Sequence, residues 1–237
     1  MWQVQPIVFA LLMHRDLMLL PVTEVIIDRV RDARDQRRQL ESIEGIMIHR
    51  VGVDLKEGLL IGYEAVSICD AFTGKDPKWK MMANATGRQN PYTFYVGGSL
   101  GPDEYDGKIW QALRLDEVGH HALRFSKRYI GVALIGDFRV RPPSERQWVS
   151  AIDLCSDLCL LFGFVHHRIV GHGEMPGAYG DKNKAPGKPN ACPGAFLNMD
   201  NFRYSVRDEM GRKVQQDAYN RIIQSGLWIP RSPARPF

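Results

Sequence analysis

The sequence predicts an α/β protein built on a single mixed central β-sheet flanked by helices. Short apolar runs rich in β-branched residues recur along the 237-residue chain, as is typical of buried strands. Longer segments with helical spacing of their apolar residues lie before, between and after these runs. Because strands and helices alternate in this order, we expect helices to pack against the faces of one sheet.

The predicted strands are short and are separated by turn-forming residues. Two of them lead directly to a histidine, His49 in the first case and His172 in the last. The predicted strands cover residues 43–49, 92–96, 108–113, 130–135 and 168–172.

The clearest helix signal begins at Ser144 and continues to Phe162. Ser144 is a favourable N-cap residue, and Gln147 lies three positions later, where it would complete a capping box. Apolar residues among many charges also predict an amphipathic helix over residues 22–40. Further helices are expected at 58–72, stopped by a glycine, and at 199–225, with an extended loop at 75–90.

These elements suggest three regions along the chain. Residues 1–42 form an N-terminal extension containing the amphipathic helix, and residues 43–203 form the principal domain. Residues 204–237 form a C-terminal helical extension that ends in a tail too rich in proline to remain helical.

Charge and composition exclude some classes of protein. The net charge of +4 is spread over several segments and is not gathered into a basic patch with interleaved aromatic residues, so nucleic acid is not an expected partner. No apolar stretch is long enough to predict an integral membrane segment. The apolar run near the N-terminus lacks preceding basic residues, so we recognise no signal peptide. We therefore expect a protein that is cytoplasmic at synthesis.

The four cysteines are too few for a disulfide scaffold. Cys155 and Cys159 lie four residues apart in an apolar helical run, so they share a helix face. Cysteine is among the residue types most often buried, which favours free thiols in the core over a redox or metal role for this pair.

Three other residues have side chains of types that bind metals: His49, His172 and Cys192. Each lies at the end of a predicted ordered segment or just after a loop. Zinc accepts imidazole nitrogen and thiolate sulfur, and a catalytic zinc typically keeps three protein ligands and one open position. Spacing alone does not establish such a site, because each of these residues taken singly is also common in a structural role.

The segments around these residues form an ordered series of short motifs. They read IMIH at 46–49, YTFYV at 92–96, IGVALIGDF at 130–138, GHGE at 171–174 and ACPG at 191–194. In this order they resemble the zinc amidase family that includes phage-type N-acetylmuramoyl-L-alanine amidases and the animal peptidoglycan recognition proteins. The resemblance covers about residues 43–203 and implies the fold of that family.

The resemblance implies a Zn²⁺ held by His49, His172 and Cys192, and a catalytic role for the hydroxyl of Tyr92. The implied substrate is peptidoglycan or a muropeptide fragment, cut at the amide between N-acetylmuramic acid and L-alanine. His121 matches a motif near the groove and is a candidate for substrate contact. Tyr95 is interpreted as a packing residue.

The chain departs from the family pattern at two positions. Asn190 stands where many members carry a lysine that stabilises developing negative charge; we keep it as a candidate catalytic residue, with Lys188 as a nearby substrate-binding candidate. Ala133 stands where some members place a glutamate. Residues 175–189 form a long loop before the last ligand, interpreted either as part of the groove or as a tolerated surface insertion.

Two other functions stay open. A module of the same fold could bind peptidoglycan without cutting it, although the loss of the cysteine ligand that usually marks such binders is not seen here. A zinc-stabilised interaction domain would need a fourth protein ligand, for which Glu174 is the nearby candidate. The expected setting is a phage or prophage lysin that is released to the cell wall, or an enzyme that recycles wall fragments.

Overall fold

The computed structural model describes residues 24–25, 37–51, 92–99, 103–119, 121–176 and 192–224. The predicted helix at 58–72, the loop at 75–90, Cys69 and the proline-rich tail lie outside the described residues.

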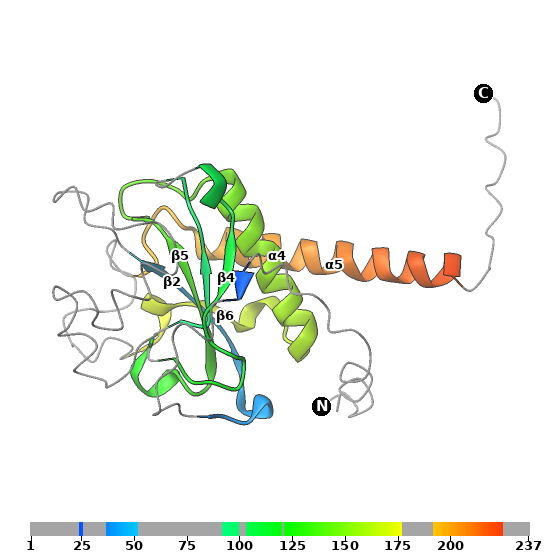
Figure 1. Cartoon of the computed structure of the whole chain (residues 1–237), viewed down its shortest axis with the longest axis horizontal. Helices are drawn as coiled ribbons and strands as arrows, with labels where there is room; N and C mark the ends of the chain where they lie inside the picture. The colour runs from blue at the N-terminus through cyan, green and yellow to red at the C-terminus, as the bar shows by residue number, and fades with distance from the viewer. Residues whose placement is uncertain are drawn as a thin grey trace.

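The described part of the chain contains a six-stranded mixed sheet with the strand order β1-β4-β3-β5-β2-β6 (Figure 1). Strands β3, β5, β2 and β6 run parallel to one another, and β4 is antiparallel to β3. This arrangement confirms the predicted fold class. The strands are β1 (Glu24–Val25), β2 (Gly45–Val51), β3 (Phe94–Val96), β4 (Ile109–Gln111), β5 (Tyr129–Ile135) and β6 (Ile169–Gly171).

Two helices, α4 (Glu145–Phe162) and α5 (Met199–Gln224), lie on the same side of the sheet (Figure 1). Alternate residues of the central strands point toward them and form the main core. The sheet contributes mainly the buried side chains Ile46, Ile48, Phe94, Val96, Ile130, Val132 and Leu134. The thiols of Cys155 and Cys159 are free and fully buried in this core, as predicted.

The capping box predicted for α4 is only half formed. The Ser144 hydroxyl accepts a hydrogen bond from the Gln147 backbone N–H, which confirms Ser144 as the N-cap. The Gln147 side chain, however, turns into the protein and donates to the carbonyl oxygens of Val96 (2.9 Å) and Ile135 (3.0 Å). Those carbonyls lie at the ends of β3 and β5, so the amide joins the helix to two strands.

The amphipathic α-helix predicted over residues 22–40 is not formed in the described parts of this segment, where only Leu40 is helical, as the first residue of a short 3-10 helix. Glu24 and Val25 form a strand parallel to β4, and Arg37 makes an isolated bridge with Glu117. Arg38 is buried, and its guanidinium donates to the carbonyl oxygens of residues 115, 126 and 129. Pairing with a sheet edge and with buried carbonyls thus overrides the local helical pattern.

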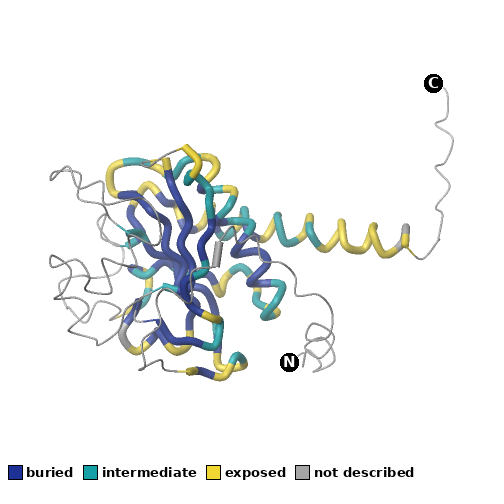
Figure 2. Tube along the Cα trace, viewed as in Figure 1, coloured by how far each residue is buried: buried dark blue, intermediate teal, exposed yellow. Residues whose placement is uncertain are grey.

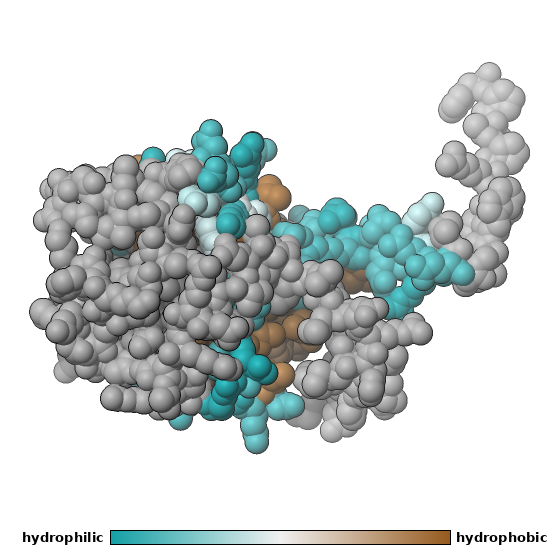
Figure 3. All heavy atoms as spheres, in the orientation of Figure 1, coloured by the Kyte–Doolittle hydropathy of each residue, from teal (hydrophilic) through white to brown (hydrophobic). Residues whose placement is uncertain are grey.

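Helix α5 confirms the helix predicted from residue 199. Its first turns pack against α4, with Phe202 meeting Trp148 edge to face, and Lys213 bonds to Asp153 and Asp157 of α4. Residues 214–221 are all exposed, and this part of α5 extends away from the sheet (Figure 2). Its surface is mostly hydrophilic (Figure 3). None of the helices in the described part of the chain combines the length and hydrophobicity that a bilayer crossing requires.

Candidate metal centre

His49 lies on β2, on the sheet face that points away from α4 and α5. Its neighbours Ile46 and Ile48 face the main core, whereas Met47 belongs to a smaller cluster on the opposite face with Ala122, Phe125 and Tyr129. Alternation along the strand places His49 on the same face as Met47. The His49 side chain is buried, at 1% exposure. The strand continues two residues beyond His49, so the predicted end of the strand was slightly early.

His172 is brought to His49 by strand pairing. Strand β6 is parallel to β2, with Ile48 opposite Gly171, so the residue that follows β6 lies beside His49. The two imidazole rings have their centroids 4.6 Å apart. A Cβ at Gly171 would lie 3.0 Å from Pro193 Cδ and 3.2 Å from Met199 Cγ, so a larger residue there would require these neighbours to shift.

Cys192 reaches the site through a turn packed on the loop after β5. Gly194 has a φ of 121°, and a Cβ there would lie 2.5 Å from the Phe138 backbone, so only glycine fits. The Gly173 N–H donates to the Cys192 carbonyl oxygen at 2.6 Å, which joins the turn to the residue after His172. Cys192 Sγ lies 3.9 Å from His49 Nδ1.

The backbone N–H of Arg50 is directed at the sulfur, with a distance of 3.3 Å to Cys192 Sγ. The Arg50 side chain is itself held by an ion pair with Asp137, which also binds Arg139. Arginine neighbours lower the pKa of Asp137, chiefly through the hydrogen bond from Arg139. The loop after β5 therefore fixes Arg50, and Arg50 provides a donor that favours the thiolate form of Cys192.

The ligand atoms of His49, His172 and Cys192 all lie within 4.8 Å of one another. Two imidazoles and one sulfur are a donor set that suits zinc and leaves one coordination position open. Their electrostatics also fit a metal. Burial, with His121 and His172 nearby, holds the pKa of His49 well below 6.5, so its imidazole is neutral as a ligand must be. Burial raises the pKa of Cys192 to about 11, partly opposed by Arg50, so a metal must displace the thiol proton.

Tyr92 lies next to these three side chains, two residues before the start of β3. Its ring centroid is 4.9 Å from that of His49 and 5.6 Å from that of Tyr95. A regular strand would direct Tyr92 and Tyr95 to opposite faces, but the chain bends at Thr93, and β3 begins only at Phe94. Tyr95 is fully buried, as expected for a packing residue.

His121 is buried, with 7% exposure, and lies behind His49. His121 Nδ1 is 2.9 Å from His49 Nε2, and His121 Nε2 is 3.1 Å from the Tyr129 carbonyl oxygen. Each ring nitrogen of His121 thus has a hydrogen-bonding partner, His49 Nε2 for one and the Tyr129 carbonyl oxygen for the other. The sequence analysis missed the contact with His49 because the two residues are 72 positions apart and no local pattern links them.

Glu174 is not directed to the metal centre. Its carboxylate forms two hydrogen bonds with the Arg203 guanidinium, at 2.9 and 3.0 Å, and accepts the Gly171 N–H at 2.7 Å. Arg203 lies on α5, where its guanidinium also forms an ion pair with Asp200. Glu174 therefore serves to attach α5 to the end of β6.

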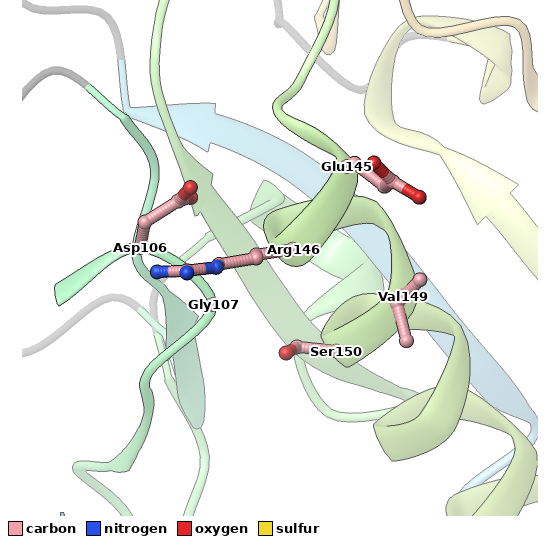
Figure 4. A pocket seen from close by; sticks show the side chains of 6 residues that line it. All are labelled: Asp106, Gly107, Glu145, Arg146, Val149 and Ser150. Carbon is pink, nitrogen blue, oxygen red and sulfur yellow. The ribbon is translucent and has the colours of Figure 1, made fainter. Parts of the chain in front are cut away.

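The remaining predicted site residues, Asn190 and Lys188, lie outside the described residues, as does most of the 175–189 loop. A separate surface pocket of about 370 Å³ lies at the start of α4 (Figure 4). It includes none of the candidate site residues, and its lining consists of Asp106, Gly107, Glu145, Arg146, Val149 and Ser150.

Comparison with known proteins assigns the chain to a family. Residues 39–195 match the family described as N-acetylmuramoyl-L-alanine amidase. The chain belongs to this family. The chain is also 30% identical over 109 residues to a peptidoglycan-recognition protein of Drosophila melanogaster, a match that covers 45% of this chain. The match spans about half the length of that relative, 48%.

Solved structures agree on the fold of this amidase-family chain. A selenomethionine derivative of AmpD superimposes with a TM-score of 0.53 at 18% identity, covering 79% of this chain and 96% of the other. The endolysin N-acetylmuramoyl-L-alanine amidase LysCS from Clostridium intestinale URNW gives 0.50 at 15% identity, covering 78% and 96%. At these identities the likeness concerns the fold alone.

Proposed function

We propose that this member of the amidase family is a zinc-dependent hydrolase that cleaves the amide between N-acetylmuramic acid and L-alanine of peptidoglycan. The observation that carries the proposal is the convergence of His49, His172 and Cys192 within 4.8 Å, from three segments far apart in the sequence. The family match and the name of the Drosophila relative support peptidoglycan or a muropeptide as the substrate.

The three side chains would hold zinc through His49 Nδ1, one ring nitrogen of His172 and the Cys192 sulfur. Zinc bound there would lower the pKa of a water molecule toward about 7 and polarise the scissile carbonyl. Water adds to the carbonyl carbon, and the carbon–nitrogen bond then breaks. The products are the lactyl carboxylate of the sugar and the free amino group of L-alanine.

Tyr92 is the described residue best placed to assist this step. Its ring packs against His49, so the hydroxyl is carried on a side chain that adjoins the ligand set. The neighbouring Thr93 is anchored on both sides, because its N–H donates to Gly131 and its carbonyl accepts from Ala112. We assign to the Tyr92 hydroxyl a hydrogen bond to the oxyanion that forms as water adds, which requires a fixed donor of this kind.

A peptidoglycan-binding module without hydrolytic activity is the alternative. Cys192 favours cleavage over this alternative, because its sulfur completes a three-ligand set with His49 and His172, and the Arg50 N–H is directed at that sulfur. A structural zinc site would require a fourth protein ligand. Glu174 does not serve as one, since its carboxylate is bound to Arg203.

The test is mass spectrometry of purified muropeptides after incubation with the full chain. We expect a peptide-free sugar and a free stem peptide that begins with L-alanine. A chelator should abolish both products, and added zinc should restore them. The matched variant is His172→Ala, which should bind less zinc and release no products. Retention of muropeptide by zinc-loaded protein without either product would show that the chain is a binding module.

A further inference from the structure

A hydrogen-bonded chain of buried groups runs from the protein interior to the candidate metal centre. The Tyr129 carbonyl oxygen lies 3.1 Å from His121 Nε2, and His121 Nδ1 lies 2.9 Å from His49 Nε2. The other ring nitrogen of His49, Nδ1, faces the Cys192 sulfur. His49 therefore has one nitrogen directed at the metal centre and the other at His121.

The carbonyl at the interior end determines where the protons lie. A carbonyl oxygen only accepts hydrogen bonds, so His121 Nε2 must carry its proton. In a neutral His121, Nδ1 is then an acceptor, and the proton between the two rings belongs to His49 Nε2. His49 Nδ1 consequently presents a lone pair toward Cys192. The reverse arrangement would leave a proton on His49 Nδ1, where it would block a metal.

We propose that His121 is a positioning residue that fixes both the ring orientation and the metal-binding tautomer of His49. This inference deepens the proposed function and rests on it, because it assigns His121 a role behind the zinc ligand. The role differs from the substrate contact expected from the sequence. A metal-bound histidine typically donates its second ring N–H to a hydrogen-bond acceptor, which here is His121 Nδ1, and loss of that acceptor typically weakens metal binding 10- to 100-fold.

The surrounding residues are arranged to hold the His121 ring in place. Gly131 lies beneath it on β5, and a Cβ there would come within 2.9 to 3.3 Å of three ring atoms. Arg38 donates to the same Tyr129 carbonyl at 2.8 Å and also to Ser126, which fixes the turn that follows His121. The Ser126 hydroxyl accepts the Ala122 N–H at 3.0 Å. The carbonyl and the turn are thus held by groups other than His121.

The variants His121→Leu and His121→Asn separate positioning from packing. Leucine fills the space but offers no acceptor, whereas asparagine keeps an acceptor oxygen near the position of Nδ1. Zinc affinity is measured by competition with a chromophoric chelator. We expect the leucine variant to bind zinc 10- to 100-fold more weakly than the unmodified chain. The asparagine variant should retain most of the affinity. Equal affinity of a folded His121→Leu variant and the unmodified chain would overturn the proposal.

A second readout uses the metal-free protein. Long-range proton–nitrogen correlation spectra should show His49 protonated at Nε2 in the unmodified chain and a mixture of tautomers in His121→Leu. Gly131→Ala tests the same role without replacing either histidine. The added methyl group should displace the His121 ring and so weaken zinc binding. This variant also keeps the proposal testable if His121→Leu fails to fold.

Different results would contradict the proposed function and the positioning role of His121. If the unmodified chain binds no zinc, the proposed function fails, and the spectra of the metal-free protein still decide the role of His121. A His49 ring protonated at Nδ1 in those spectra would overturn the positioning role, whatever the chain hydrolyses.

Discussion

At the scale of single residues, the candidate site depends on departures from regular structure. Tyr92 reaches His49 because the chain bends at Thr93, and the buried Thr93 is hydrogen-bonded to Gly131 and Ala112. Cys192 reaches the histidines because Gly194 adopts a positive φ against the loop after β5. Motif matching identified these side chains, but their contacts follow from backbone geometry that a regular periodicity does not encode.

Replacing Tyr92 with phenylalanine tests the assigned hydroxyl. Tyr92→Phe keeps the ring that packs on His49 and removes only the donor. We expect the turnover number to fall about 10²- to 10³-fold, as for the loss of a central oxyanion donor. Zinc content should stay unchanged.

Tyr95→Phe is the matched control because Tyr95 is a buried tyrosine of the same strand segment. It should affect stability more than turnover. If Tyr92→Phe turns over muropeptide at the unmodified rate, Tyr92 is only a packing residue.

At the scale of elements, most of the strands and helices could be predicted from periodicity. The five predicted strands and the helices from residues 144 and 199 all occur, with boundaries shifted by a few residues. The edge strand β1 was missed because its two residues pair with β4 through long-range contacts, whereas the charged and apolar residues around it follow helical spacing. The predicted boundaries of the three regions, at residues 42 and 203, stay predictions.

Gln147 shows how tertiary contacts replace a local motif. Its amide donates to Val96 and Ile135 and is buried at 1% exposure, so it ties α4 to β3 and β5. The charge-bearing substitution Gln147→Glu keeps the size but removes both donors. A buried group left without its hydrogen bond costs about 1–3 kcal/mol, so the free energy of unfolding should fall by at least this amount.

Chemical denaturation of Gln147→Glu and Ser144→Ala measures the two roles separately. Ser144→Ala removes the helix cap and the hydrogen bond from the Ser144 hydroxyl to Asp106. Loss of the cap alone should cost about 1 kcal/mol. A Gln147→Glu variant that loses no more stability than Ser144→Ala would show that the two strand contacts contribute little.

At the scale of the whole molecule, one face of the sheet packs the main apolar core and the other face carries the candidate site. The face toward α4 and α5 is filled by apolar side chains, and the opposite face carries His49, His121 and Tyr95. The sequence predicted this division only in part, because alternation along β2 shows which residues share a face but not which partner each one meets. The Glu174–Arg203 pair connects the two sides by attaching α5 to the end of β6.

The metal centre should make the stability of the molecule depend on zinc and on pH. Zinc at 100 times its dissociation constant should stabilise the fold by about 2.7 kcal/mol, and a chelator should remove this increment. In the metal-free protein, the pKa of His49 lies well below 6.5 because the ring is buried and adjoins His121 and His172. The unfolded chain binds a proton at His49 as the pH falls below about 6.5, whereas the folded chain binds it only at a lower pH. The metal-free protein should therefore lose stability as the pH falls below about 6.5, by at most about 1.4 kcal/mol per pH unit from this residue.

Chemical denaturation of the metal-free protein between pH 7.5 and 5.5, with and without added zinc, measures both effects. His49→Asn is the control, since it removes the titrating ring, and its stability should fall less steeply over this range. The zinc increment of the unmodified chain should also shrink toward low pH, because the metal must displace the proton of Cys192, whose pKa is raised to about 11. Identical pH slopes for the unmodified chain and His49→Asn would mean that His49 is not held neutral in the fold. A zinc increment independent of pH would argue against a ligand set containing both imidazole and thiolate.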